Sequence, residues 1–303
     1  MKAAKWHIVL SIITILILAA PFSSCTMVGQ VKSKVAVIPL SGTIVGASQQ
    51  GMLATTGIST DLVRSQLKKA KDDLGVKAVV LRIDSPGGSA AASQEIASEI
   101  RRFKDNTGKP VVVSMGDTAA SGGYYISVYA DKIVANPSTL TGSIGVISQI
   151  IYIEGLLEKL GLKMETIKSG EHKDMGIRPL TDEERQIMQD ITDDLYEQFV
   201  LAVAEGRSLP VADVKKLATG QLYTGEQALK LGLVDELGGV SRAIELAASL
   251  AGVTAPEVEE YRPSPSLFEK LLEGFSSSSS LPFSEDELLF LRTLEGWQVM
   301  PRY

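Results

Sequence analysis

Ser121 has the sequence surroundings of a nucleophile. The apolar run at residues 110–115 predicts a buried strand, and residues 124–130 can continue as a helix. The serine is therefore expected at a strand-to-helix junction, where unpaired N–H groups and the helix dipole favour an oxyanion intermediate. Gly122 and Gly123 would let a substrate backbone approach closely. The alternative is an N-capping serine followed by ordinary turn glycines.

A second glycine turn could supply the oxyanion hole. Gly87 and Gly88 stand between a predicted strand at residues 77–83 and a predicted helix at residues 90–103. Backbone N–H groups in such a turn can hold an oxyanion, although glycine-rich turns also bind phosphates. Arg82 and Asp84, just before this turn, either order it or form a surface pair.

Several motifs resemble one family, the signal peptide peptidase A family of membrane-bound serine–lysine proteases. They are Ala120-Ser121-Gly122-Gly123-Tyr124-Tyr125, Thr141-Gly142-Ser143-Ile144-Gly145-Val146, Gly206-Arg207-Ser208-Leu209-Pro210 and Ala218-Thr219-Gly220-Gln221-Leu222-Tyr223-Thr224-Gly225. The resemblance extends from about Val35 to about Gly239. It implies a crotonase-like, caseinolytic-protease-like α/β fold of repeated ββα units with a long helical oligomerisation segment.

The same resemblance assigns the site. It implies that Ser121 is the nucleophile, that the N–H groups of Gly88 and Gly122 bind the oxyanion, and that no cofactor is needed. Residues 167–174 resemble the family's lysine-bearing loop, which makes Lys173 the general base. The resemblance also implies a homo-oligomeric ring in which each serine meets the lysine of a neighbouring protomer.

The sequence alone leaves the base open. A lysine must be neutral to accept a proton, so burial has to lower its pKa from ~10.4 to ~7–8. Lys173 lies beside Glu171, His172 and Asp174, and its own chain gives no sign of such burial, so it could be an ordinary solvated lysine. His172 and Lys168 are the alternative bases.

Two other patterns carry less weight. Ser65 and Lys68 match the serine–x–x–lysine motif of penicillin-recognising enzymes, and Lys168-Ser169-Gly170 resembles their Lys-Thr-Gly motif. Ser65 and Lys68 fall on the polar side of a predicted amphipathic helix, so we interpret the match as chance. His172 is the one histidine beyond the N-terminal segment, which argues against a zinc or histidine-rich metal site.

The N-terminus has the features of a targeting segment. Lys2 and Lys5 flank the start of an apolar run at residues 8–20, which precedes Cys25. An uncleaved anchor, a lipoprotein signal cut before Cys25 and a cleaved secretory signal are the three options. Each places the body outside the cytoplasm, and we expect the periplasmic face of a bacterial inner membrane. The net charge of −6 and pI near 5.2 argue against nucleic acid as a partner.

Three parts are expected along the chain. They are a signal or anchor segment at 1–30, a Ser–Lys protease domain at 31–254 and a partly linker-like tail at 255–303. Within the domain we expect strands alternating with helices in parallel βαβ units. Further predictions are a helix at 151–163, a strand at 163–168 and a long helix from Thr181 to about Gly206. Its buried stripe would be Ile187, Ile191, Leu195 and Phe199.

The expected function is that of an endopeptidase acting on membrane-associated apolar peptides, chiefly remnant signal peptides. The competing class is a non-catalytic crotonase-like scaffold whose serine is idle. Acyl-CoA chemistry on the same fold is disfavoured by export, because the outer compartment lacks that cofactor pool.

Overall fold

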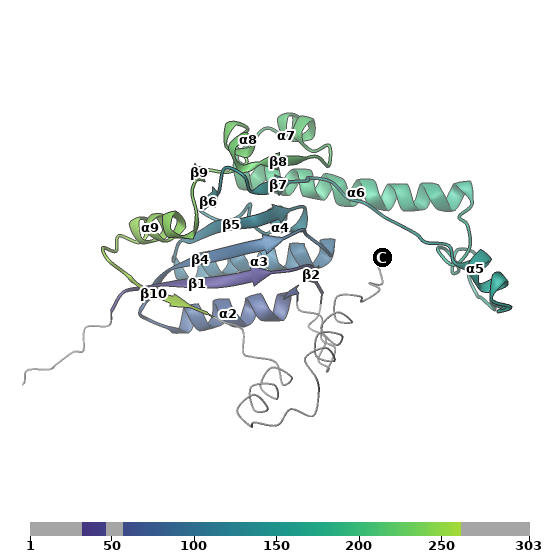
Figure 1. The fold of residues 1–303 in the computed structure, drawn as a ribbon, viewed down its shortest axis with the longest axis horizontal. Helices are drawn as coiled ribbons and strands as arrows, with labels where there is room; N and C mark the ends of the chain where they lie inside the picture. The colour runs from purple at the N-terminus through teal and green to yellow at the C-terminus, as the bar shows by residue number, and fades with distance from the viewer. Residues whose placement is uncertain (1–31, 47–56, 262–303) are drawn as a thin grey trace, which may run out of the picture. The chain divides into compact units, whose positions relative to one another are not determined.

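The computed structural model describes residues 32–46 and 57–261, shown in colour in Figure 1. The described residues from Ser33 onward belong to one compact unit. Predictions for the anchor segment, Cys25, most of the loop at 46–57 and the tail beyond residue 261 lie outside the described residues. No helix in the described ranges is long and apolar enough to cross a membrane.

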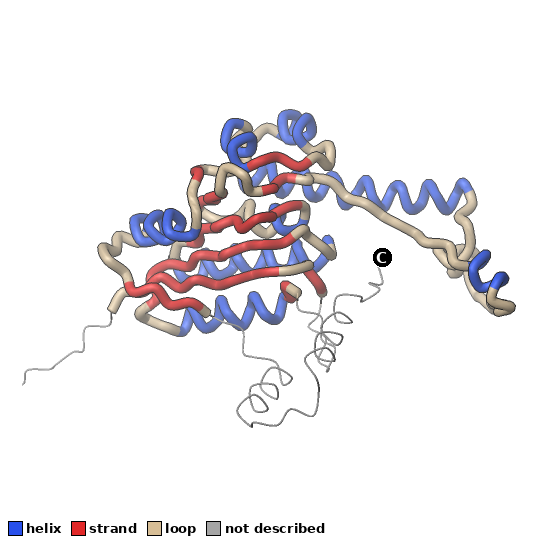
Figure 2. The backbone as a smooth tube through the Cα atoms, viewed as in Figure 1, coloured by secondary structure: helices blue, strands red, loops and turns tan. Residues whose placement is uncertain are grey.

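A mostly parallel sheet forms the centre of an α/β fold (Figure 2). Its main path runs β10-β1-β4-β5-β6-β9, and the short strands β7 and β8 extend the far end of β5. All pairings are parallel except that between β7 and β8. The bounds are β1 Lys34–Ser41, β4 Val76–Ser85, β5 Val111–Ala120, β6 Lys132–Ala135, β7 Leu140–Gly142, β8 Leu222–Thr224, β9 Glu236–Leu237 and β10 Glu257–Glu260. Strands β2 (Ile44–Val45) and β3 (Ile58–Ser59) form a separate short pair.

Helices cover both faces of this sheet. One core contains β4 residues such as Leu81 and Ile83 together with α2 and α3, and the other packs Val80 and Val112 against α9. Burial on both faces explains why the strands read as continuous apolar runs. The helices are α2 Thr60–Asp72, α3 Ala90–Thr107, α4 Gly122–Tyr125, α5 Glu154–Lys159, α6 Asp182–Arg207, α7 Val211–Leu217, α8 Gly225–Lys230 and α9 Val240–Leu250.

The predicted α/β alternation is confirmed, and so is the start of the long helix. Thr181 Oγ1 accepts from the Glu184 N–H, and the Glu184 carboxylate accepts from the Thr181 N–H, which is a complete capping box. The helix expected after Ser121 is shorter than predicted, since α4 ends at Tyr125. The helix expected at 151–163 is limited to α5.

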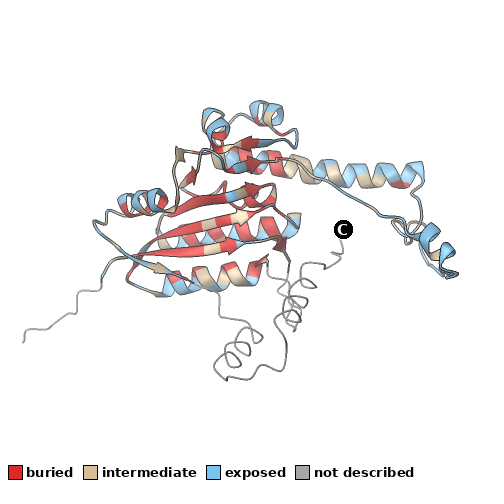
Figure 3. Cartoon of the chain, viewed as in Figure 1, coloured by how far each residue is buried: buried red, intermediate tan, exposed pale blue. Residues whose placement is uncertain are grey.

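Residues 146–181 and the first half of α6 form an arm that extends away from the sheet (Figures 1 and 3). The strand predicted at 163–168 is wrong, because this stretch is exposed and has no neighbouring strand to pair with. The predicted stripe on α6 is also wrong for most of its length. Phe199 is buried, whereas Ile191 is 49% exposed, because the first half of α6 extends past the sheet.

Replacement of Leu81 by alanine tests the central core. Leu81 is fully buried between β1, β5 and the helices, so Leu81→Ala should lower the free energy of unfolding by about 3 kcal/mol through lost transfer energy and a cavity. Leu74→Ala is the matched control, because Leu74 is 78% exposed, and it should change stability by less than about 0.5 kcal/mol. Urea denaturation measures both. Equal losses in the two variants would contradict the assigned core.

Candidate active site

Ser121 occupies a strained turn at the carboxyl edge of the sheet. It joins β5 to α4 with φ 52° and ψ −120°, a conformation that residues with a side chain rarely adopt. Its N–H donates to Gly142 O at 2.8 Å and its carbonyl accepts from Tyr125 N–H at 2.9 Å. These two hydrogen bonds keep the backbone of Ser121 in its strained conformation. Ser121 stands at the N-cap position of α4, but its hydroxyl makes no capping bond.

The second glycine turn lies directly against this serine. Because β4 and β5 are parallel neighbours, their carboxyl ends meet at one edge of the sheet. A Cβ built on Gly87 would lie 2.9 Å from Ser121 Cβ, and one on Gly122 would lie 3.3 Å from Gly88 N. Side chains at Gly87 and Gly122 would therefore separate the two turns. The structure thus brings together three residues predicted for the site: Ser121, Gly88 and Gly122.

The N–H groups of Gly88 and Gly122 are open to a ligand. Ile44 forms a parallel bridge with Gly88, in which Ile44 N–H donates to Gly87 O at 2.8 Å and Ser89 N–H donates to Ile44 O at 3.0 Å. In this pairing the N–H of Gly88 itself points away from β2. Within residues 32–46 and 57–261, neither glycine N–H donates a hydrogen bond.

Ser85 supports the glycine turn and was not singled out from the sequence. Its side chain is fully buried, and its Oγ accepts from Gly87 N–H at 3.1 Å. Gly87 has φ 105°, a value that favours glycine, so this bond helps to fix the turn that presents Gly88. The position of a serine at the end of a strand, two residues before a glycine pair, was the available signal.

Lys173 lies on the arm, away from Ser121. It is exposed in the segment between α5 and α6, and its backbone N–H donates to Gly170 O at 3.4 Å. Its neighbour His172 places Nδ1 3.4 Å from Glu184 Oε1, near the start of α6. The position of Lys173 can therefore be measured along α6.

The length of α6 separates this lysine from the serine. Phe199, further along α6, packs on Tyr125 with ring centroids 5.1 Å apart, and Tyr125 bonds back to Ser121. Glu184 precedes Phe199 by 15 residues on the same helix, a rise of about 22 Å. A lysine side chain cannot span that distance. Within one chain the structure does not bring Lys173 and Ser121 together.

A charged network holds the loop that carries Lys173. Arg178 donates to Asp174 at 3.0 Å and to Glu184 at 2.8 Å, and Lys168 Nζ lies 2.7 Å from Asp174. The Arg178 guanidinium, with help from the Thr181 N–H, lowers the pKa of Glu184 to about 2. Hydrogen bonds from Lys168, and then from Arg178, likewise lower the pKa of Asp174. The loop is therefore held by ion pairs in the absence of an apolar core.

The three candidate bases differ in how they take part in this network. Lys168 is in an ion pair with Asp174, and the strand on which it was expected to lie does not form. His172 contacts Glu184 and therefore lies far from Ser121, as the rest of the loop does. The Lys173 ammonium makes no ion pair or hydrogen bond within the described part of the chain. The neighbouring acids Asp174 and Glu184 bind other cations, which leaves Lys173 as the unpaired cation of the loop.

The other patterns have structural explanations. Ser65 Oγ donates to Leu62 O at 2.8 Å and Lys68 pairs with Asp72 at 2.6 Å, as expected on a solvated helix face. Arg82 donates to Met115 O at 2.7 Å and Asp84 Oδ1 accepts from Thr118 N–H at 3.0 Å. Both residues therefore bind β4 to β5.

One group on the arm has spacing suited to a cation. Ligand atoms of Glu171, His172 and Glu183 lie within 4.8 Å of one another. Glu171 and Glu183 are exposed, and exposed acidic groups of this kind are common without an ion. We assign no metal to them.

The charged network predicts a pH-dependent stability. The folded pKa of Glu184 is about 2, below its usual 4.5, so its contribution is present above pH 4.5 and is lost as pH falls towards 2. Glu184→Gln should therefore lower the Tm most at neutral pH, and the gap to wild type should close towards pH 2. Scanning calorimetry from pH 7 to 2 measures the gap. Glu183→Gln, at a 72% exposed neighbour, is the control. A gap that stays constant with pH would contradict the assignment.

Comparison with known proteins identifies relatives of this chain. The profile described as Peptidase family S49 matches residues 103–254. A Synechocystis sp. protein named as a protease is 40% identical over 241 residues, which cover 79% of this chain and 80% of that protein. An Enterococcus faecium protein named as a signal peptide peptidase is 41% identical over 231 residues, covering 72% of this chain and 67% of that protein.

A plant relative is longer. The chloroplastic serine protease SPPA of Arabidopsis thaliana is 37% identical over 256 residues, which are 82% of this chain and 37% of that protein. Among solved structures, a mutant of the membrane-bound stomatin-specific protease 1510-N covers 77% of this chain and 99% of its own at 19% identity, with a TM-score of 0.48. So low a likeness supports no statement about this chain.

Proposed function

The chain belongs to peptidase family S49 and is a serine peptidase, and on this premise we propose that Ser121 and Lys173 form its catalytic dyad. The proposed enzyme is a membrane-associated endopeptidase that degrades remnant signal peptides and other apolar peptides outside the cytoplasm. One observation carries the assignment of the serine. The Ser121 hydroxyl makes no capping bond and lies on a strained turn, beside the N–H groups of Gly88 and Gly122, which have no hydrogen-bond partner among the described residues.

This arrangement supports acyl transfer. Ser121 Oγ attacks the peptide carbonyl carbon, and the oxyanion accepts hydrogen bonds from Gly88 and Gly122. The base takes the serine proton and gives it to the leaving amine as the C–N bond breaks. Water then hydrolyses the acyl-enzyme. Each step uses groups of the protein and water, so no cofactor is required.

The arm supports a base supplied by a second protomer. Lys173 is unpaired among the described residues, and its loop is held at Glu184, a rise of about 22 Å along α6 from Phe199 on the serine side of the helix. The arm also exposes large apolar side chains, including Ile147, Ile151 and Ile167 at 75%, 77% and 93% exposure. Docking of this arm on a neighbour would bury such surface and remove water from the amine, which is what a neutral lysine needs. A crotonase-like ring with α6 as its oligomerisation element follows from this proposal.

The substrate class follows from two further observations. The apolar run at residues 8–20 favours association with a membrane, where remnant signal peptides remain after cleavage. The Enterococcus faecium relative is named for action on signal peptides. Together they favour short apolar peptides as substrates of this chain.

Complementation between two inactive variants tests the dyad. Ser121→Ala and Lys173→Ala should each reduce cleavage of a signal-peptide-like fluorogenic substrate at least about 1,000-fold, because both groups act in one proton transfer. Co-expression of the two should restore about one quarter of wild-type activity, since random assembly joins an intact serine to an intact lysine at one boundary in four. Lys163→Ala, another exposed lysine of the arm, is the matched control and should remain active.

The outcomes separate the parts of this proposal. Two inactive variants that do not complement each other would reject the sharing of the dyad between chains. Activity that persists in Ser121→Ala would reject the serine as nucleophile. A purified wild-type chain that cleaves no peptide would favour the non-catalytic scaffold.

Ser85→Ala tests the support of the oxyanion hole. Loss of the bond to Gly87 N–H should loosen the turn that presents Gly88 and lower kcat about 10-fold with little change in KM, because the oxyanion forms only after binding. Ser127→Ala is the matched control, since Ser127 is equally buried and donates to Gly123 O at 2.7 Å. Steady-state kinetics measure both. A similar loss in the two variants would indicate general destabilisation.

A further inference from the structure

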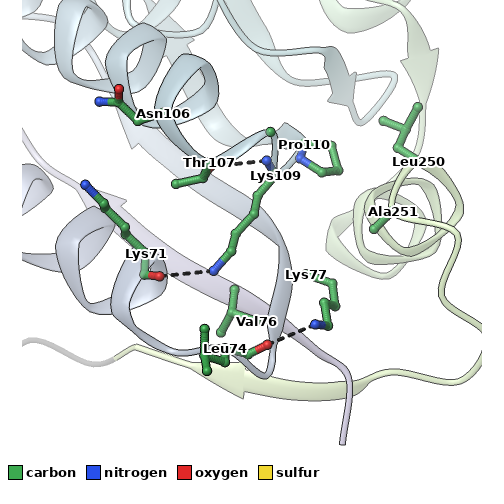
Figure 4. Close-up of a pocket in the computed structure, with 11 residues that line it drawn as sticks. Lys71, Leu74, Val76, Lys77, Asn106, Thr107, Lys109, Pro110, Leu250 and Ala251 are labelled. Atoms are coloured by element: carbon green, nitrogen blue, oxygen red, sulfur yellow. Dashed lines mark hydrogen bonds between the residues drawn. The ribbon is translucent and has the colours of Figure 1, made fainter. Parts of the chain in front are cut away.

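A basic hollow lies at the edge of the sheet opposite Ser121. Figure 4 shows this pocket of about 560 Å³, between the last turns of α2 and α3 and the end of α9. Val76, the first residue of β4, lines it, whereas Ser85 ends the same strand beside the glycine turn. The pocket and the candidate active site are therefore at opposite ends of β4.

Among the described residues, the pocket is lined by three lysines and by no acidic residue. They are Lys71, Lys77 and Lys109. The two acids that follow Lys71 bind other cations, Asp72 with Lys68 at 2.6 Å and Asp73 with Lys34 at 3.1 Å. The Lys71 ammonium has no ion pair among the described residues. Asp72 and Asp73 attract the Lys109 ammonium, and Asp72 also attracts that of Lys71. Neither acid lines the pocket, so the described lining keeps a surplus of positive charge.

The lysines also hold the pocket in shape. Lys109 Nζ donates to the α2 carbonyls of Ala70 at 2.6 Å and Lys71 at 3.3 Å, and to Asp73 O at 3.0 Å, and burial lowers its pKa. Lys77 Nζ donates to Leu74 O at 2.9 Å (Figure 4). These bonds fix the loop between α2 and β4 to its neighbours, so the cations are presented by a rigid edge.

Exposed apolar side chains stand beside these cations. Leu74, in the loop between α2 and β4, is 78% exposed, and Leu250, at the end of α9, is 45% exposed. Large aliphatic side chains next to lysines suit the interface of a bilayer, where the chain enters the acyl boundary and the ammonium groups meet phosphates.

The described chain begins at this same edge. Lys34 N–H, at the start of β1, donates to Gly75 O at 2.7 Å, so β1 starts beside the loop that carries Leu74. The apolar run at 8–20 and Cys25 precede Lys34, and an extended chain from Cys25 to Lys34 spans at most about 30 Å. A lipid on Cys25 would therefore keep this edge within about 30 Å of the bilayer surface, whereas an anchor that ends at residue 20 allows about 50 Å.

We propose that this basic hollow faces the membrane and binds the phosphate-bearing headgroups of anionic lipids, with Leu74 entering the bilayer interface. The inference rests on the membrane association in the proposed function. It adds an orientation: β4 rises about 30 Å from the hollow to the glycine turn. Peptides are then cut well above the headgroups, after they have left the bilayer.

Lysine footprinting of the full chain in nanodiscs tests this orientation. Acylation of Lys71 and Lys77 should slow about 5-fold or more in nanodiscs of phosphatidylcholine mixed with phosphatidylglycerol, compared with phosphatidylcholine alone. Lys230 on α8, whose side chain is 70% exposed, is the internal control and should react equally in both. Mass spectrometry reads each lysine separately, and peptide cleavage is assayed in the same samples.

A variant pair sharpens the test. Lys71→Gln combined with Lys77→Gln should raise amide exchange at residues 73–77 about 5-fold more in the anionic nanodiscs than in phosphatidylcholine nanodiscs, where only the loss of the Lys77–Leu74 bond acts. Lys215→Gln combined with Lys230→Gln should leave exchange at these residues unchanged in both. Both control lysines are exposed and lie on other helices. The double variant should keep its peptidase activity on a free peptide.

Other outcomes overturn the proposal. Equal acylation in the two nanodiscs would show that this edge does not meet anionic lipid. Slowing by inorganic phosphate in phosphatidylcholine nanodiscs, with no further effect of phosphatidylglycerol, would make the hollow a site for free anions. A chain that cleaves peptide but does not incorporate into nanodiscs would reject membrane association and leave the peptidase assignment standing. An incorporated chain without activity would reject only the catalytic proposal.

Discussion

The contact between two glycine turns is the constraint on which the rest of the site depends. The β4–β5 register shifts between Ile83 and Ser85, so that Ser85 pairs with Ala119 instead of continuing the earlier alignment. The shift moves the end of β5 back to the level of the Gly87–Gly88 turn. The Asp84 carboxylate accepts from Thr118 N–H and Gly142 O accepts from Ser121 N–H, which holds the end of β5 on both sides. Only glycine at positions 87 and 122 permits the resulting approach. The strained serine is thus a product of sheet register as much as of its own motif.

The two glycine turns lie in contact, whereas the arm holds the Lys173 loop away from Ser121. Its loop is rigid because Arg178 is bound by two carboxylates, but it is rigid at a distance from the serine. Lys173 is exposed, and nothing in the described part of its own chain covers it. A partner that buried the arm would supply proximity and desolvation together. Assembly would then switch on catalysis, and an isolated chain would carry both halves of the dyad without being active.

Prediction from the sequence succeeded for segments whose apolar side chains are buried by other residues of the same chain. The strands expected at 77–83 and 110–115 formed as β4 and β5, because both faces of the sheet are buried within one chain. The Thr181–Glu184 capping box was predictable because it depends only on residues close in sequence. Prediction failed on the arm, where a strand was expected at 163–168 and Ile191 was expected to be buried. The spacing of apolar residues indicates which side chains favour burial, but it does not indicate whether the same chain or a partner chain buries them. The strained backbone of Ser121 was likewise out of reach, because it depends on bonds from Gly142 and Tyr125 that form only in the folded sheet.

The parallel sheet also has two different edges, one formed by strand starts and the other by strand ends. In parallel strands every N-terminal end lies at one edge and every carboxyl end at the other. Because β1 is the first strand of the described chain, any tether upstream of it must attach at the N-terminal edge, while the turns that follow β4 and β5 must lie at the far edge. The start of β1 and the glycine turns therefore lie at opposite edges of the sheet. Under the proposed attachment to a membrane through residues before β1, a peptide would have to reach the far edge of the sheet before it is cut.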